Sequence, residues 1–142
     1  MDEQILPFTN ISHPAPHRHR VSLGALVFGI AGAPLAWNVE LLAGAALAGH
    51  QCYPRDIPLS LPRWTGTWEF LLTLSLAAIV LGLSAGGVAW HSWGRVRDEM
   101  SGSGGEGRTR FLALSGMLCS GLFLLALLFT LAVVWLVPLC ST

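Results

Sequence analysis

Charge is scarce in this sequence of 142 residues, and lysine is absent from it. Charged residues make up 11% of the chain, whereas a soluble domain carries about 25%. The eight basic residues are all arginine and are balanced by eight acidic ones, so the charge balance gives no indication of a nucleic-acid partner. Three cysteines without CxxC spacing exclude a disulfide-built miniprotein and give no pattern for structural zinc or thioredoxin-like chemistry.

Hydrophobic residues are abundant, at 53% of the chain, and the mean hydropathy is +0.59. Three long apolar runs stand out: residues 21–49 hold one charged residue, Glu40, while residues 70–90 and 111–139 hold none. About 20 apolar residues cross a hydrocarbon core as a helix, and backbone amides in lipid need hydrogen-bond partners within their own segment. The alternation of barrel strands is absent. The sequence therefore predicts an all-α membrane protein with three transmembrane helices in a small bundle.

Arginines near the ends of these runs predict the orientation. Six lie before the first run or between the second and third, and two lie between the first and second. Positive charge favours the cytoplasmic side, so we expect a cytoplasmic N-terminus and a C-terminus on the outer side. The predicted segments are a disordered cytoplasmic head (1–20), helix one (21–49), an outer proline-rich loop (50–69), helix two (70–90), a cytoplasmic Gly/Ser-rich loop (91–110), helix three (111–139) and an outer tail (140–142).

Two cysteines follow closely after the ends of apolar runs. Cys52 comes after the first run and Cys140 after the third, which places both thiols at the outer side, where disulfides persist. We predict a disulfide between them that ties the C-terminus to the outer loop. One alternative is a copper or haem iron site formed by His50, Cys52 and Cys140, although a fourth ligand is missing. A second alternative is two free thiols, and Cys119 within the third run is predicted to be a packing residue.

Glu40 is the one charged residue deep within a predicted span. An ionised carboxylate in lipid costs several kcal/mol, so we expect it to be neutral unless a partner subunit brings a cation. Partners at the same depth are Asn38, Thr73, Ser75 and Thr130. Glu40 and Asn38 thus form a candidate intramembrane polar site, for proton exchange or partner docking, or only for hydrogen bonds between helices.

Proline and small residues indicate how the helices pack. Pro34 removes a backbone hydrogen bond to the carbonyl of Ile30 and predicts a kink in the first helix. Gly82 and Gly86 form a GxxxG pattern on the second helix, which allows close helix approach. Small-residue pairs of the same spacing occur on the other two helices, at Gly44 and Ala48 and at Gly116 and Ser120.

The sequence contains no motif for catalysis. There is no paired-carboxylate site, no nucleophile with a base and an orienting group, and no phosphate loop with its lysine. We therefore predict that the protein is not an enzyme and has no cofactor, with copper or haem as the alternative. The lipid bilayer and other integral membrane proteins are the expected partners.

Two stretches of the chain carry a resemblance to known proteins. The residues concerned are Gly32–Trp37, Glu40–Leu42, Ala46–Leu47 and His50–Pro54, then Arg110–Ala113, Gly116–Met117, Ser120, Leu122–Phe123 and Val137–Cys140. They resemble a family of small uncharacterised three-span proteobacterial membrane proteins, encoded near cytochrome c oxidase and oxidase-assembly genes. The resemblance implies a bacterial inner-membrane location with the outer loop and C-terminus in the periplasm.

The same resemblance implies a function. It indicates a non-catalytic accessory subunit or assembly factor of a haem-copper terminal oxidase, with oxidase subunits as partners. Gln is frequent in the family where Glu40 stands, which argues against obligatory proton chemistry there. The alternatives are a copper or haem handling protein that uses His50, Cys52 and Cys140, and a small transporter or channel component with Glu40 in its path.

Overall fold

The structure is a computed structural model that describes residues 21–96 and 107–140. Its elements are α1 (Leu23–Cys52), the short 3₁₀ helix η2 (Pro54–Asp56), α2 (Thr67–Val96) and α3 (Gly107–Leu136). No strand occurs within these residues. The predicted head, the Gly/Ser-rich part of the loop between α2 and α3 and the last two residues lie outside the described residues.

All three long helices are apolar and long enough to cross a membrane. This confirms the predicted all-α fold with three candidate spans. Each helix has 30 residues, which corresponds to about 45 Å at 1.5 Å per residue. They are longer than the hydrocarbon core of about 30 Å, so their ends can reach the headgroup layers. For this reason α2 begins before the apolar run 70–90 and continues beyond it.

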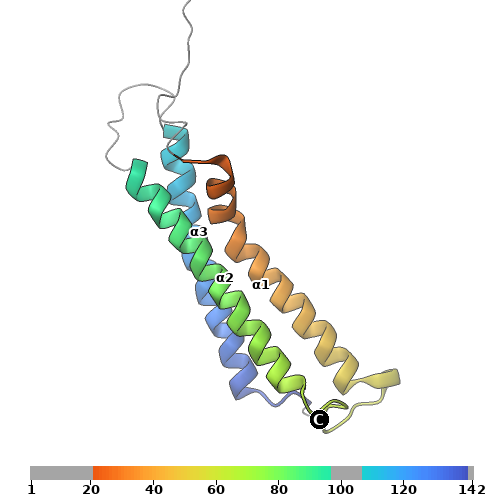
Figure 1. Cartoon of the computed structure of the whole chain (residues 1–142). Coiled ribbons are helices and arrows are strands. Elements are labelled where there is room, and N and C mark those ends of the chain that lie inside the picture. Colours follow the sequence, from red (N-terminus) through yellow and green to blue (C-terminus); the bar gives the residue numbers. More distant parts are fainter. Residues whose placement is uncertain (1–20, 97–106, 141–142) are drawn as a thin grey trace, which may run out of the picture.

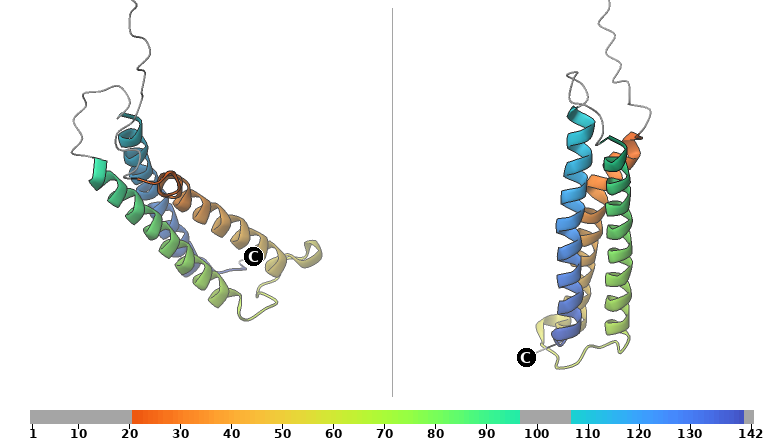
Figure 2. Two further views of the ribbon diagram at one scale, coloured as in Figure 1. Left: turned by 45° about the horizontal axis from the view of Figure 1, so that its top comes forward. Right: turned by 90° about the vertical axis from the view of Figure 1, so that its left-hand side faces the viewer.

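The helices form a slender bundle in which consecutive helices run antiparallel and each one contacts the other two (Figure 1). The N-terminal third of α1 bends away from the direction of its remainder, and this part is seen end-on in the left view of Figure 2. Pro34 lies inside α1, where its missing N–H and its ring prevent a regular turn. The observed bend agrees with the predicted kink.

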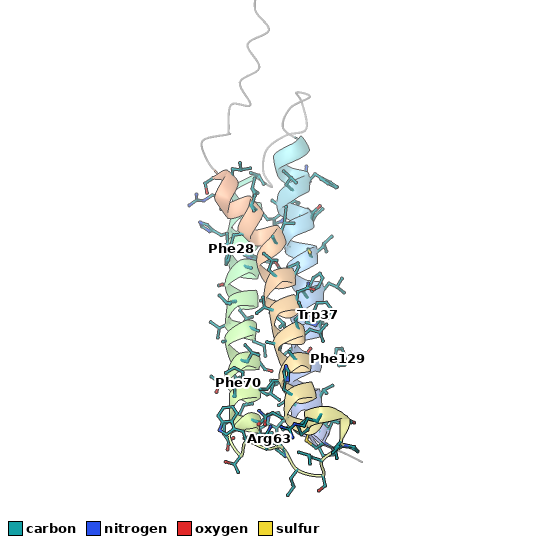
Figure 3. The ribbon with its side chains drawn as sticks, turned by 90° about the vertical axis from the view of Figure 1, so that its right-hand side faces the viewer. Phe28, Trp37, Arg63, Phe70 and Phe129 are labelled. Carbon is teal, nitrogen blue, oxygen red and sulfur yellow. A yellow bond between two sulfur atoms is a disulfide. The ribbon has the colours of Figure 1, made fainter. Side chains whose placement is uncertain are left out.

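Small residues fill the interior of the bundle, and large apolar residues point outward. The buried residues are mostly Ala, Gly, Ser and Thr, with Ala33, Ala85 and Leu127 fully enclosed. Phe129 points away from the helices (Figure 3) and is 72% exposed. This distribution suits a bilayer, because lipid solvates the outer side chains and small residues let the backbones approach.

The connection between α1 and α2 follows a definite path back over the end of α1. The Leu59 N–H donates to the Cys52 carbonyl at 2.8 Å, and the Trp64 N–H donates to the Gln51 side-chain oxygen at 3.0 Å. Arg55 has a φ of 56°, in the left-handed region that a non-glycine residue seldom adopts. The loop is thus attached to α1 by hydrogen bonds from two separate points along its length.

Candidate functional site

All three helices meet at Gly29 of α1. A Cβ atom on Gly29 would lie 3.1 Å from the Cβ of Ala89 in α2, and one on Gly116 of α3 would lie 3.3 Å from the carbonyl carbon of Gly29. The Ser120 hydroxyl donates to the Gly29 carbonyl at 2.8 Å. We call Gly29, Ala89, Gly116 and Ser120 the helix crossing. Its geometry requires residues with almost no side chain.

The small-residue pattern on α2 continues this close packing. A Cβ on Gly82 would lie 2.9 Å from side-chain atoms of both Leu124 and Leu127, whereas one on Gly86 would make ordinary contacts at 3.6 Å or more. The predicted GxxxG pair therefore faces α3, and at Gly82 an added Cβ would require the ends of two leucine side chains to shift. On α1, a Cβ on Gly32 would come within 2.8 Å of the Ala85 Cβ.

Hydrogen bonds to the backbone flank the bend of α1 on both sides. One residue before Ile30, whose carbonyl we predicted to be freed by Pro34, the Gly29 carbonyl accepts the hydrogen bond from Ser120 of α3. The Pro34 carbonyl accepts a bond from the Asn38 side chain at 2.9 Å. A serine from α3 thus contributes to holding α1 next to its bend, a contact that helix spacing alone did not indicate.

Glu40 lies buried between α1 and α2, on the opposite side of Pro34 from the crossing. The Ser75 hydroxyl donates to Glu40 Oε1 at 2.5 Å, and the two residues are 3% and 1% exposed. Glu40 Oε2 is also buried and has no hydrogen-bond partner among the described residues. The nearby buried cluster of Ala36, Ala78 and Leu127 is apolar. The site is therefore a carboxyl group with one bonded oxygen and one unbonded oxygen.

The other proposed partners of Glu40 bond within their own helices. Asn38 donates to Pro34, Thr73 donates to the Glu69 carbonyl at 2.7 Å, and Thr130 donates to the Ala126 carbonyl at 3.0 Å. Serine and threonine hydroxyls commonly bond to the carbonyl four residues earlier in this way. The predicted grouping of Glu40 with Asn38 is thus not a direct contact, and Ser75 takes that place.

The Cys52–Cys140 disulfide that we predicted is present. The two Cα atoms are 5.4 Å apart, and the bond joins positions separated by 88 residues. It ties the end of α1 to the segment after α3, and Cys52 is only 2% exposed. At the same end of the bundle, Trp68 of α2 and Trp135 of α3 meet edge to face with ring centroids 5.6 Å apart. This end of the bundle is held by a covalent bond and an aromatic pair.

The alternative metal site does not gain a ligand set from this geometry. His50 is exposed in the last turn of α1, and both sulfur atoms are in the disulfide, whereas the thiolate is the form of cysteine that binds metal. No three His, Cys, Asp or Glu side chains gather at metal-binding distance in the described parts of the chain. Copper or haem binding through these residues would require the reduced form.

Comparisons with known proteins give no family assignment. Models of protein families, curated proteins and solved structures were all compared with this chain, and none matches.

Proposed function

We propose that this chain is a non-catalytic accessory subunit or assembly factor of a haem-copper terminal oxidase in the bacterial inner membrane. The resemblance in the sequence supports the oxidase as partner, and the distribution of arginines supports a cytoplasmic N-terminus and a periplasmic C-terminus. The three membrane-spanning helices agree with an integral membrane subunit. The protein would act by packing against the larger complex.

One observation carries this proposal: the loop after α1 exposes large apolar side chains from a fixed backbone. Tyr53, Ile57, Leu61 and Trp64 are 58%, 63%, 75% and 48% exposed, and we call these four residues the outer apolar surface. The disulfide at Cys52 and the loop's hydrogen bonds to α1 fix its position. Because a rigid surface loses little conformational entropy on binding, it is suited to docking a partner.

The interior of the bundle favours a packing role for a separate reason. At Gly32 and Gly82, even one added Cβ would come within 2.9 Å of a neighbouring side chain. This close approach of the helices supports packing in preference to a substrate path between them. Moreover, only 11% of the most apolar stretch of α3 is buried in the bundle, compared with 28% for the corresponding stretches of α1 and α2. Most of α3 is therefore left to contact lipid or another membrane protein.

Purification from native membranes in mild detergent tests this function. We expect oxidase subunits to co-purify stoichiometrically, with haem absorption in the same fraction. The double variant Ile57→Ser/Leu61→Ser removes exposed apolar groups and should abolish this association. Arg63→Gln, an exposed change in the same loop, is the matched control and should retain it. A free protein without oxidase subunits would contradict the proposal, and one that carries copper or haem alone would support metal handling.

A second candidate, a proton or cation path, is favoured by the buried and unbonded Oε2 of Glu40. Glu40→Gln tests it, because glutamine keeps an oxygen that accepts from Ser75 but does not titrate. Under the packing function, oxidase association and turnover in Glu40→Gln should equal those of the parent protein. A loss of proton-coupled turnover, with association intact, would instead support the path.

A further inference from the structure

A groove lined by both polar and apolar residues opens between the N-terminal part of α1 and the C-terminal half of α2. Its volume is about 520 Å³, and its walls include Ser22 and Ala25 on one side and Ser84, Gly87, His91 and Arg95 on the other. Ligand pockets in proteins commonly have volumes of about 300 to 1,000 Å³. The groove is unrelated to Glu40 and to the outer apolar surface, and the proposed function does not use it.

The residues on the α2 side recur at intervals of three or four along the helix, and therefore form one continuous face. From Ser84 to Arg95 this face extends about 16 Å along α2, at 1.5 Å per residue. The part near the helix end carries an imidazole and a guanidinium, and the part nearer the middle of the membrane carries Gly87 and Val88. The groove is thus cationic at its Arg95 end, and toward the other end it is lined by Gly87 and Val88 and then by Ser84.

Contacts between the helices leave this space open on one flank. Gly29 and Ala89 bring α1 and α2 together beside the groove, level with the middle of its length, and Val21 packs against Val96 and Ala113 at the helix ends. Between these two contacts the N-terminal part of α1 follows the bend at Pro34 (Figure 2). A Cβ on Gly87 would meet no atom within 4 Å, so the missing side chain at this position enlarges the groove.

The Arg95 end of the groove lies at the level along the helices that the headgroup layer of a bilayer would occupy. Trp90 and Trp93 lie in the same turns of α2 as His91 and Arg95, and indole side chains favour the membrane interface. The Arg110 guanidinium lies over the Trp93 ring, 5.6 Å from its centroid. The Ser22 hydroxyl accepts from the Ala25 N–H at 3.1 Å, which leaves its proton able to donate to a ligand.

We propose that this groove binds one anionic phospholipid, with its phosphate at His91 and Arg95 and the start of an acyl chain along Ala25, Gly87 and Val88. Arginine recognises phosphate through charge-assisted hydrogen bonds. A free phosphate ion would use only the cationic end, whereas a phospholipid fills both ends and arrives from the surrounding membrane. The chemistry and the shape together favour the lipid.

The test uses the full chain in detergent and native mass spectrometry with phosphatidylglycerol or phosphatidylcholine of the same acyl chains. We expect one phosphatidylglycerol to be retained, with an affinity about tenfold higher than that for phosphatidylcholine, because only the former has a net negative charge. Gly87→Leu should fill the groove and remove this binding. Arg95→Gln should remove the preference for the anionic lipid while the helices remain assembled.

Matched controls exist for both variants. For Gly87→Leu the control is Gly121 of α3, which also has no atom within 4 Å of an added Cβ but does not line the groove. The two glycines lie at similar depth, because a Cβ on Gly86, next to Gly87, would lie 3.7 Å from the Cβ of Ser120, next to Gly121. Gly121→Leu should bind lipid like the parent protein. Arg63→Gln, in the loop at the other end of the bundle, should do the same.

Three results would overturn the proposal. The first is a folded Gly87→Leu variant, with parental helix content and an intact disulfide, that still binds phosphatidylglycerol with parental affinity. The second is equal retention of the two lipids by the parent protein, or an Arg95→Gln variant that keeps the parental preference for phosphatidylglycerol. The third is displacement of phosphatidylglycerol by inorganic phosphate alone, which would identify a site for the free ion. Loss of oxidase association would not affect any of these outcomes, so the two proposals fail separately.

Discussion

The helix crossing and the disulfide end hold the same three helices in different ways. At the crossing, the helices approach closely because Gly29, Ala89 and Gly116 have little or no side chain. A Cβ added to Gly29 would lie 3.1 Å from the Ala89 Cβ, and one added to Gly116 would lie 3.3 Å from the Gly29 carbonyl carbon. At the other end, Trp68 and Trp135 meet through their rings, and the Cys52–Cys140 bond joins the chain covalently. One region depends on absent side chains, and the other depends on large side chains and a covalent bond.

This difference follows from what each region has to hold. The crossing lies within the spans, where van der Waals packing and hydrogen bonds between helices replace the hydrophobic effect as the source of association. The disulfide end includes a loop and a chain end beyond the apolar runs, where ordering costs conformational entropy. A disulfide lowers that cost because it restricts the unfolded chain as well. Substitutions that affect only one region can therefore measure each contribution.

The largest expected effect comes from Gly116→Leu at the crossing. Its Cβ would already lie 3.3 Å from the Gly29 backbone, which cannot move aside as a flexible side chain could. Since overpacking a core costs about 1 to 3 kcal/mol and occasionally more, we expect a loss of about 3 kcal/mol in the free energy of unfolding, measured by detergent denaturation. Gly121→Leu on the same helix has open surroundings and should change stability by less than about 0.5 kcal/mol. Equal effects of the two substitutions would contradict the account of the crossing.

The second effect is the loss of the disulfide in Cys52→Ser/Cys140→Ser. The chain-entropy estimate for closing so long a loop is about 4 to 5 kcal/mol. Helices that stay inserted in lipid already restrict the unfolded chain, so we expect a smaller loss of about 2 kcal/mol. In the parent protein, thiol labelling without reductant should reach at most Cys119, and reduction should add Cys52 and Cys140. Full labelling of all three without reductant would show that the bond is not formed.

Much of this architecture could be predicted from the sequence because it depends on long-range composition. Long apolar runs with at most one charged residue predicted the spans, and the positions of Cys52 and Cys140 after two parallel helices predicted the disulfide. The partner of Glu40 could be narrowed only to residues at the same depth, since depth does not fix rotation about a helix axis. Rotation decided that Ser75 faces Glu40, while Asn38 bonds to Pro34.

The same uncertainty in rotation hid two other features. Ser120 was identified as a small packing residue, but its bond to the Gly29 carbonyl depends on where the bend leaves that carbonyl. The groove beside His91 and Arg95 depends on the direction in which α1 bends. Proline indicates that a helix bends and leaves the direction to its packing. Contacts between the helices therefore determine both the Ser120–Gly29 bond and the groove, and these contacts could not be predicted from the sequence.

The third prediction concerns the middle of the bundle, between the two regions compared above. Ser75→Ala removes the hydrogen bond to Glu40 and leaves both carboxyl oxygens without a partner among the described residues. A buried polar group that loses its partner costs about 1 to 3 kcal/mol, so we expect a loss of about 1 kcal/mol in the free energy of unfolding. Thr73→Ala on the same helix is the control, because Thr73 is exposed and bonds only within α2. A Ser75→Ala loss no greater than that of Thr73→Ala would refute the interaction.

The smallest expected effect is that of Ser120→Ala, which separates the two components of the crossing. Alanine retains the Cβ and removes only the hydroxyl that donates to Gly29, so close packing persists while the hydrogen bond is lost. Hydrogen bonds between membrane helices contribute about 0.6 kcal/mol on average in double-mutant cycles, and we expect a loss of that size in detergent denaturation. Thr130→Ala, which loses a bond within α3, serves as the comparison. If Ser120→Ala lowered the free energy of unfolding as much as Gly116→Leu does, the crossing would depend on hydrogen bonding. The contrast with the disulfide end would then be explained by polar contacts instead of by absent side chains.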